Sequence, residues 1–426
     1  MNTDTGFITS IPMRAILMVC LAAMISRAQG QVYDYQELLD SAKALFKNEI
    51  ISDQAPAQKP DYQRIANILE LVVDINPNSS EARYFLAYTY SRMSLGDANG
   101  IPKMDLSTLY KTSMHLEKVI ELSPKYAGEI VILDPYSKLT AEWGSMAMSY
   151  LYNNKIDSAK WALMEGRKRG GFGDYHLEVA KNTLNACHEN AILISSGDNF
   201  SFPLLYVQYL EDYRKDISVV DISLLNSSWY PSYLSNNKIV SFDLPNEVLD
   251  TISYKKWSDT LITINDFSWT VNPTYYNQYL LRGDLIFLSL LKKNEFARDL
   301  YFTVGFYEDQ RLSLKEHIRP LVLVDELNVN GHPLLNDKEY KDNIFRALSN
   351  TKHINSNSQD NLYLLDIFRR DILIKINHYI SDGEKSKAYE LAEILNMYGR
   401  EDKYPYQSES LETFARYLRS TGGVGF

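Results

Sequence analysis

The sequence predicts a protein with all-α and α/β parts, in which helical repeats flank a small α/β domain with a mainly parallel sheet. Large, small and apolar residues recur at matching offsets in successive helix-turn-helix units in the first third of the chain, and one such unit returns near the C-terminus. The short β-branched runs AILISS and ISVVDISLL lie in the middle. Such repeated units are typical of stacked helix pairs, and β-branched runs separated by a helical pattern are typical of parallel strands.

The chain has 426 residues, which is more than one core usually serves, so we expect several domains. We predict a signal peptide over residues 1–30 and helical repeats over 31–184. An α/β domain is expected over 185–335, and a linker with C-terminal helices over 336–426.

Composition narrows the class of function. The formal net charge is −10, and no long basic block is present. An acidic chain of this kind is a poor partner for a phosphate backbone, so we expect no binding to nucleic acid.

The N-terminal residues have the features of a secretory signal peptide. A positive charge at Arg14 precedes a short apolar run, and small residues follow it. We expect translation to start at Met1 or Met13 and cleavage to occur near Ala28 or Gly30. The mature chain is then expected in the periplasm or elsewhere in the cell envelope.

Cysteines and histidines give no support for a metal centre or a cross-link. Cys20 leaves with the signal peptide, so Cys187 has no partner for an intramolecular disulfide or a cysteine zinc site. His115 and His378 are expected in helices, on the surface or in a groove, without paired ligand spacing. We expect no metal and no cofactor. No later stretch reaches the roughly 18 apolar residues of a membrane span, so no span is expected in the mature chain.

Three helix pairs are predicted before residue 170. Pro77 and Pro124 close the first two units. Small residues let the two helices of a unit approach closely, while large residues fill the groove to the next unit. The residues expected at these repeat-packing positions are Leu86, Ala87, Tyr90, Trp143, Ala147, Tyr150 and Ala159. A further unit near the C-terminus places Ile372, Tyr379, Ala388, Ala392 and Leu395 at corresponding positions.

This spacing resembles the tetratricopeptide repeat (TPR) family over about residues 35–170. The turn inside the second unit is longer than in that family, and the third unit lacks its closing proline. The resemblance implies a concave helical surface that binds a peptide or a protein segment.

The middle of the chain predicts strands. ILISSGDNFSFPLLYVQ, from Ile192 to Gln208, predicts a strand, a tight turn and a helix, and ISVVDISLL predicts a second strand parallel to the first. DLYFTVGF and PLVLVDEL predict further strands. LLRGDLIFLSLLKKN predicts a helix with Asp284 as its N-cap. NSNSQDN predicts a polar linker into the final helices.

The stretch SSGDNFSFPLLYVQYLEDYRKDISVVDISLLNSSWY resembles the soluble C-terminal region of a family of bacterial membrane proteins. That family is similar to protein O-mannosyltransferases and carries segments of the types GDNDTFPLWYLQ and SLLNTDWY. The matching residues here are Gly197, Asp198, Asn199, Phe202, Pro203, Gln208, Ser223, Leu224, Leu225, Asn226, Trp229 and Tyr230. RDLYFTV is similar to the family's RPIYFAV, and the resemblance covers about residues 185–400.

The resemblance implies an α/β unit beside TPR-like helices in an extracytoplasmic setting. In the family, glycosyl transfer is attributed to the membrane-spanning part, and here a signal peptide and helices stand in its place. We therefore expect the chain itself to be no enzyme.

Asp198 has three interpretations. It follows a predicted strand, where open parallel sheets often bind ligands, and a cleft shared with Asn226 and Trp229 would make it a binding residue. Alternatively, Asp198 or Asn199 bonds the backbone of a turn and Ser201 caps the helix. Catalysis is the third interpretation.

Several aromatic residues lie in the loops of the α/β domain. Trp229, Tyr230, Trp269, Tyr275 and Tyr276 either gather at one end of the sheet and stack on sugars, or pack the domain against its helices.

Together these patterns predict an exported, non-enzymatic scaffold that binds a peptide or protein partner in the cell envelope. The alternative is a glycan-binding protein or an accessory to a membrane glycosyltransferase.

Overall fold

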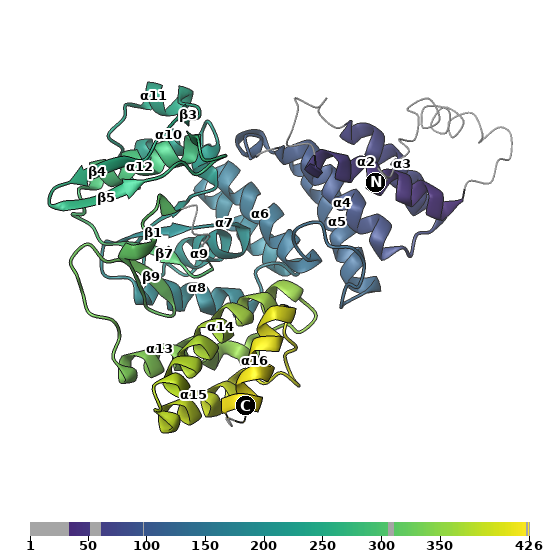
Figure 1. The fold of residues 1–426 in the computed structure, drawn as a ribbon. Helices are drawn as coiled ribbons and strands as arrows, with labels where there is room; N and C mark the ends of the chain where they lie inside the picture. Colours follow the sequence, from purple (N-terminus) through teal and green to yellow (C-terminus); the bar gives the residue numbers. More distant parts are fainter. Residues whose placement is uncertain (1–33, 52–60, 97, 306–310, 423–424, 426) are drawn as a thin grey trace, which may run out of the picture.

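The computed structural model describes residues 34–51, 61–96, 98–305, 311–422 and 425 (Figure 1). The expected signal peptide lies outside these residues. The described chain is mostly helical and carries one small mixed sheet in its middle, which confirms the predicted fold class.

The first part of the described chain is helical, and its helices begin at short polar residues. Asp61, Ser79, Asp105 and Asp134 each accept a hydrogen bond from the backbone N–H three residues further on, which satisfies a donor that the helix leaves free. The helices are α2 (Tyr35–Ile51), α3 (Tyr62–Ile75), α4 (Ser80–Leu95), α5 (Leu106–Leu122), α6 (Pro135–Tyr152), α7 (Ile156–Lys168) and α8 (Asp174–Ala186).

Consecutive helices pack against one another in this part, most closely α4 with α5 and α6 with α7. Small residues permit these contacts: a Cβ atom on Gly166 of α7 would lie 2.5 Å from Cβ of Trp143 on α6. Of the predicted repeat-packing residues, Leu86, Ala87, Tyr90, Trp143, Ala147 and Ala159 are buried and Tyr150 is partly buried. The helix pairing is thus visible, and the assignment to the tetratricopeptide family stays a prediction.

Helix α6 is enclosed on nearly all sides. It contacts α5 and α7, and α9 (Asp198–Leu210) of the α/β part covers a further face. Gly144 makes this last contact possible, because a Cβ atom there would lie 2.2 Å from the ring of Phe202. Little of α6 is therefore left for a partner protein.

The sheet combines parallel and antiparallel pairs. Its order is β2-β1-β7-β9-β8, in which β1 pairs in parallel with β2 and β7, and the pairs β7–β9 and β9–β8 are antiparallel. The predicted parallel pair is confirmed. The strands of this sheet are β1 (Ile192–Ser195), β2 (Ser218–Asp221), β7 (Leu300–Thr303), β8 (Ile318–Pro320) and β9 (Val324–Leu327).

Two small ribbons and three helices lie between β2 and β7. The ribbons pair β3 with β6 and β4 with β5. These elements are α10 (Tyr230–Asn236), α11 (Asn246–Thr251), β3 (Lys255–Lys256), β4 (Thr260–Ile264), β5 (Phe267–Val271), β6 (Tyr279–Leu280) and α12 (Arg282–Asn294). The predicted N-cap of α12 is wrong: Asp284 lies inside the first turn, where its side chain accepts a hydrogen bond from N–H of Leu281 at 2.9 Å.

The C-terminal helices have a hydrophobic core of their own, to which α8 contributes Tyr175 and Val179. The elements from α2 to β9 share another core. The C-terminal helices are α13 (Asp337–Ser349), α14 (Gln359–Ser381), α15 (Lys385–Tyr398) and α16 (Glu409–Gly422). The residues expected in the C-terminal repeat unit, Ile372, Tyr379, Ala388, Ala392 and Leu395, are all buried between α14, α15 and their neighbours.

The polar stretch from Asn355 to Asn361 forms the N-terminal end of α14 as well as the connection that leads into it. Ser358 is the N-cap of α14, and its side chain accepts a hydrogen bond from N–H of Asn361. Asn361 is itself buried.

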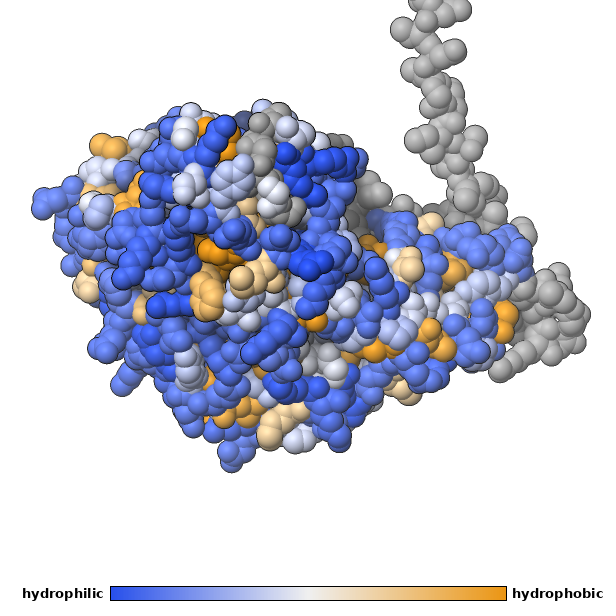
Figure 2. Space-filling view, turned by 90° about the horizontal axis from the view of Figure 1, so that it is seen from below, coloured by the Kyte–Doolittle hydropathy of each residue, from blue (hydrophilic) through white to orange (hydrophobic). Residues whose placement is uncertain are grey.

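The face on the side of the C-terminal helices shows apolar residues only in small groups among hydrophilic ones (Figure 2). Within the described residues, every helix is too short or too polar to cross a lipid bilayer.

Candidate functional site

The carboxyl ends of β1 and β2 lie side by side. Ser195, at the end of β1, pairs with Asp221, at the end of β2. The segment that follows β1 therefore opens at the edge of the sheet where parallel α/β folds usually bind ligands. At this edge α9 lies against α6.

The turn after β1 depends on a glycine. Gly197 is the N-cap of α9 with φ +83° and ψ 160°, a backbone conformation that suits glycine alone. No side chain caps this helix, and the backbone N–H of Ser201 bonds to the carbonyl of Gly197 at 3.0 Å. The prediction that Asp198 or Asn199 bonds the turn and Ser201 caps the helix is therefore wrong.

Asp198 instead directs its carboxylate toward charged groups of α6. Burial raises the pKa of this carboxyl to about 6; Lys138 opposes the rise, and Asp221 and Glu142 add to it. Asp198 as a whole is half-buried, and the protein atoms around its carboxyl group are dense enough to raise the pKa. Among the described residues, no hydrogen bond to this carboxylate is present.

Lys138 and Glu142 lie one turn apart on the same face of α6. Nζ of Lys138 lies 2.7 Å from Oε1 of Glu142, donates to Oγ of Ser91 at 2.9 Å and stands 4.6 Å from the ring centre of Tyr88. The side chain of Glu142 is 1% exposed. Its two oxygens nevertheless accept no well-aligned hydrogen bond from the described residues, so the ion pair leaves acceptor capacity unused.

A cavity of about 160 Å³ opens between α4, α6 and α9. Its polar lining includes Ser91, Arg92, Lys138, Ser145 and Asp198. The rest of the wall is mainly apolar and includes rings from α4 and α9. We call this space the Asp198 cavity. It combines one carboxylate with two cationic side chains, hydroxyl groups and an aromatic wall.

Asp221 has a structural role at the same edge. One oxygen bonds with Oγ of Ser201, and the other accepts hydrogen bonds from N–H of Ser223 and Leu224. Burial raises the pKa of Asp221, and these bonds counteract the rise. Asp221 thus holds the turn after β2 against α9.

Asn199 points to another part of the molecule. Its side chain bonds the carboxylate of Asp360, at the start of α14. Asp134 and Asp360 lie at the N-terminal ends of α6 and α14 and exchange two hydrogen bonds. The backbone N–H of Asp134 donates to Oδ2 of Asp360 at 2.9 Å, and the backbone N–H of Asp360 donates to Oδ2 of Asp134 at 3.0 Å. Negative charge at the positive ends of both helices stabilises the contact, while burial and Asp134 raise the pKa of Asp360.

The other two predicted ligand-binding residues lie elsewhere. The side-chain oxygen of Asn226 accepts a hydrogen bond from N–H of Gly283 at 2.9 Å, at the start of α12. Trp229 is buried, and its Nε1 donates to the carbonyl of Ala98 at 3.0 Å. Neither residue lines the Asp198 cavity, so the cleft expected among Asp198, Asn226 and Trp229 is not formed.

The aromatic residues of the loops do not form one platform. Trp229 and Tyr230 pack around α10, and Trp269 is buried with its Nε1 bonded to the carbonyl of Leu312. Tyr275 and Tyr276 are exposed on a separate turn. The side chains of Trp229, Tyr230 and Trp269 are therefore packed in the interior.

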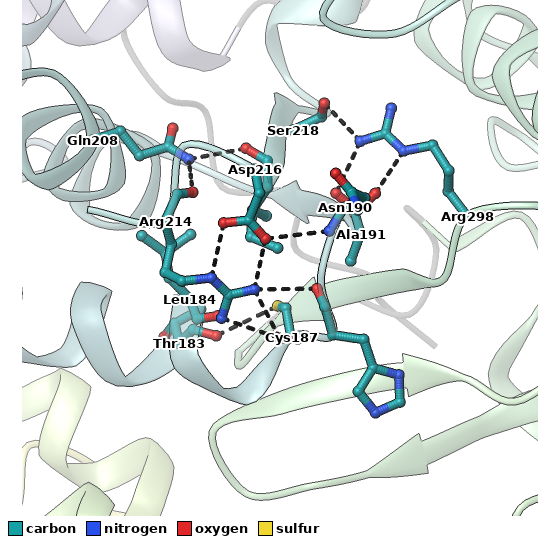
Figure 3. Close-up of polar contacts among 12 residues, drawn as sticks. Thr183, Leu184, Cys187, Asn190, Ala191, Gln208, Arg214, Asp216, Ser218 and Arg298 are labelled. Carbon is teal, nitrogen blue, oxygen red and sulfur yellow. Dashed lines mark hydrogen bonds and ion pairs between the residues drawn. The ribbon is translucent and has the colours of Figure 1, made fainter. Parts of the chain in front are cut away.

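Two arginines hold the opposite edge of the sheet, where β1 and β2 begin (Figure 3). Arg214 bonds both oxygens of Asp216 at 2.9 Å, and it donates to carbonyls at the end of α8 and just after it. Arg298 donates to the carbonyls of Asn190 and Ala191 and to Oγ of Ser218. These contacts fix the starts of the two strands whose other ends form the site.

The sequence did not lead us to the charged residues that α6 and α14 bring to this region. Lys138 and Glu142 had one usable signal, since they are two charges four residues apart in a helix that is otherwise almost entirely apolar or small. The contact between Asp134 and Asp360 had no local signal in the sequence, because it joins residues 226 positions apart.

The two histidines singled out in the sequence and Cys187 differ in their exposure to solvent. His115 is buried, and burial lowers its pKa to about 4, with Arg83 adding to the effect. His378 is exposed. Cys187 is buried, as expected of a small apolar residue. In the described part of the chain, no three histidine, cysteine or acidic side chains are placed to hold a metal ion.

Residues 176–278 match the family model described as TMEM260-associated domain 2. TMEM260 is itself grouped with the O-mannosyltransferase-like proteins. The matched segment runs from α8 to the end of β5 and beyond, and it contains Asp198, Asn199 and Asp221. No curated protein matches the chain.

Proposed function

We propose that this chain is an exported accessory protein of a glycosyltransferase system, and that it binds a sugar or a short glycan in the Asp198 cavity. One observation carries the proposal. The carboxylate of Asp198 faces a cavity at the carboxyl end of a parallel strand, and none of the described residues forms a hydrogen bond with it.

The chemistry of the cavity suits a hydroxyl-rich ligand. Carboxylate oxygens accept hydrogen bonds from hydroxyl groups, and Lys138 and Ser91 can donate to them. The aromatic wall offers an apolar surface to the C–H groups of a sugar ring. The volume of about 160 Å³ is below the usual range of ligand pockets, so we expect room for no more than one sugar ring at the end of a chain.

The match to TMEM260-associated domain 2 supports the glycosylation setting, because the matched residues include Asp198 and both strands that position it. Export is proposed from the signal-peptide features of the sequence. A scaffold for a peptide ranks second, since α9 covers a face of α6 that a concave helical surface would otherwise offer.

Isothermal titration of the mature chain with methyl mannoside, methyl glucoside and mannobiose tests the proposal. We expect saturable binding of at least one of these sugars, and we expect Asp198→Asn to abolish it. The matched control is Asp157→Asn, which changes an exposed carboxylate on α7 and should bind like the native chain. If no sugar binds, or if Asp198→Asn binds as tightly as the native chain, the proposal is wrong.

Asp198 and the neighbouring Glu142 of α6 favour a further candidate function, which is acid–base chemistry on the bound sugar. A buried carboxyl whose pKa lies near 6, beside a second buried carboxylate, is a pattern found in enzymes that act on glycosidic bonds. Release of free sugar from a glycoside by the native chain, and its absence with Asp198→Asn, would identify this function.

A further inference from the structure

A second and larger cavity lies on the other side of α9. It has a volume of about 430 Å³, within the range of small-molecule sites, and lies between α9, β2 and α10. The Asp198 cavity and this one share Phe202 and Leu224 as lining residues. The two are thus adjacent but separate.

Three tyrosines, Tyr209, Tyr230 and Tyr233, give the cavity an uncharged aromatic wall. The rings of Tyr230 and Tyr233 are stacked, with centres 6.1 Å apart and planes 21° from parallel. The hydroxyl groups of Tyr209 and Tyr233 bond each other. Burial raises the pKa of all three tyrosines, so they stay neutral at physiological pH.

Positive charge borders the cavity. Lys215 and Lys238 line it, and both residues are exposed to solvent. Lys215 pairs with Asp212, whereas Lys238 makes no ion pair within the described residues. Asp221 also lines the cavity, but both of its oxygens are bonded to the turn after β2 and to Ser201.

Backbone groups of β2 also border the cavity. β2 is the outermost strand of the sheet, and Val219 of this strand is part of the lining. The outer edge of such a strand presents backbone donors and acceptors that no neighbouring strand uses, and the N–H of Asp221 on β2 donates to the hydroxyl of Tyr230.

We infer that this cavity is a binding site for a planar aromatic molecule with one anionic group. The ring lies against the tyrosine wall and Leu205, and the anionic group reaches Lys238 at the border. This site is separate from the sugar site proposed above and does not depend on it.

Anilinonaphthalene sulfonate is a suitable probe, because it joins planar rings to one anionic group and becomes fluorescent in an apolar site. Titration into the mature native chain should give one saturable site. Near-ultraviolet circular dichroism must show native packing in every sample, because this probe also binds partly unfolded chains.

Two variants separate the contributions of shape and charge. Leu205→Trp fills the cavity and should remove the fluorescence gain. Lys238→Gln should weaken binding about two- to fivefold, as expected for one solvent-exposed charge pair, and should reduce its dependence on salt. Lys292→Gln, an exposed lysine on α12, is the matched control and should bind like the native chain.

Absence of a saturable site in the native chain would overturn the inference, and so would unchanged binding in Lys238→Gln. The result with Lys238→Gln can be interpreted even if Leu205→Trp fails to fold, because Lys238 is exposed and its replacement should not disturb folding. Asp198→Asn should leave binding of this probe unchanged, so a failure of the sugar site and a failure of this site give different results.

Discussion

Replacing Asp198 by Asn should stabilise the protein above pH 6. In the native chain the pKa of this carboxyl rises from 3.8 to about 6, since its charged form is buried and lies near Asp221 and Glu142. One pKa unit corresponds to about 1.4 kcal/mol, so the folded state loses about 3 kcal/mol when the group ionises. Asn has the same shape and no charge, and Lys138 keeps its partner Glu142.

The sign follows from the direction of the pKa change. Because the folded state holds the proton more tightly than the unfolded state, this group favours folding below pH 4, and the contribution is lost as the pH rises through about 6. The figure of about 3 kcal/mol is an upper bound, since the residue is half-buried and contact with solvent screens its charge. We expect a gain of about 1–3 kcal/mol at pH 8 and no gain at pH 4.

Urea denaturation of the native chain and of Asp198→Asn at both pH values measures this difference. Comparison of the two chains is essential, because Asp360 and Asp371 also have raised pKa values and titrate in the same range. Asp157→Asn, at an exposed site, should change stability by less than about 0.5 kcal/mol. If Asp198→Asn is less stable than the native chain at pH 8, the reasoning is wrong. That result would instead favour the interpretation in which the Asp198 side chain bonds the backbone of the turn.

Four further outcomes are expected. Trp143→Ala should cost about 3–5 kcal/mol in chemical denaturation, because its side chain is fully buried and its Nε1 donates to Oγ of a serine on α5. Gly144→Ala should cost about 1–3 kcal/mol in the same assay, since the new methyl group overlaps the ring of the α9 phenylalanine. Arg214→Gln should lower the free energy of unfolding by at least about 2 kcal/mol. The control Arg416→Gln, at an exposed position on α16, should lower it by less than about 1 kcal/mol. Intact mass of the chain from the envelope fraction should place the mature N-terminus at Gln29 or Gln31, and a retained signal would contradict export.

The strands and helices of the site could be predicted because their signals are local. Four β-branched or apolar residues followed by SSGDN are enough to indicate β1 and a turn, and ISVVD indicates β2. The direction of the Asp198 side chain could not be predicted, because it depends on where α6 lies. A short polar residue after a glycine is equally typical of a helix cap.

The cavities and the buried charges escaped prediction for a different reason. Lys138 and Glu142 occupy one face of α6, and only the approach of α9 encloses them. Likewise, Asn226 and Trp229 follow β2 as closely in sequence as Asp198 follows β1, yet the structure uses them to hold α12 and the turn near Ala98. Sequence proximity to a strand end indicated the region, and tertiary packing decided which side chains face the cavity.

The contact between Asp134 and Asp360 bears on the order in which the chain folds during synthesis. Helix α6 leaves the ribosome long before α14, because 226 residues separate the two partners. Until α14 arrives, the N–H of Asp134, the N-cap residue of α6, lacks the carboxylate that it binds in the finished protein. Nascent chains stalled before residue 360 should therefore hold α6 loosely and be cut by protease near Asp134, whereas release of the complete chain should protect that site.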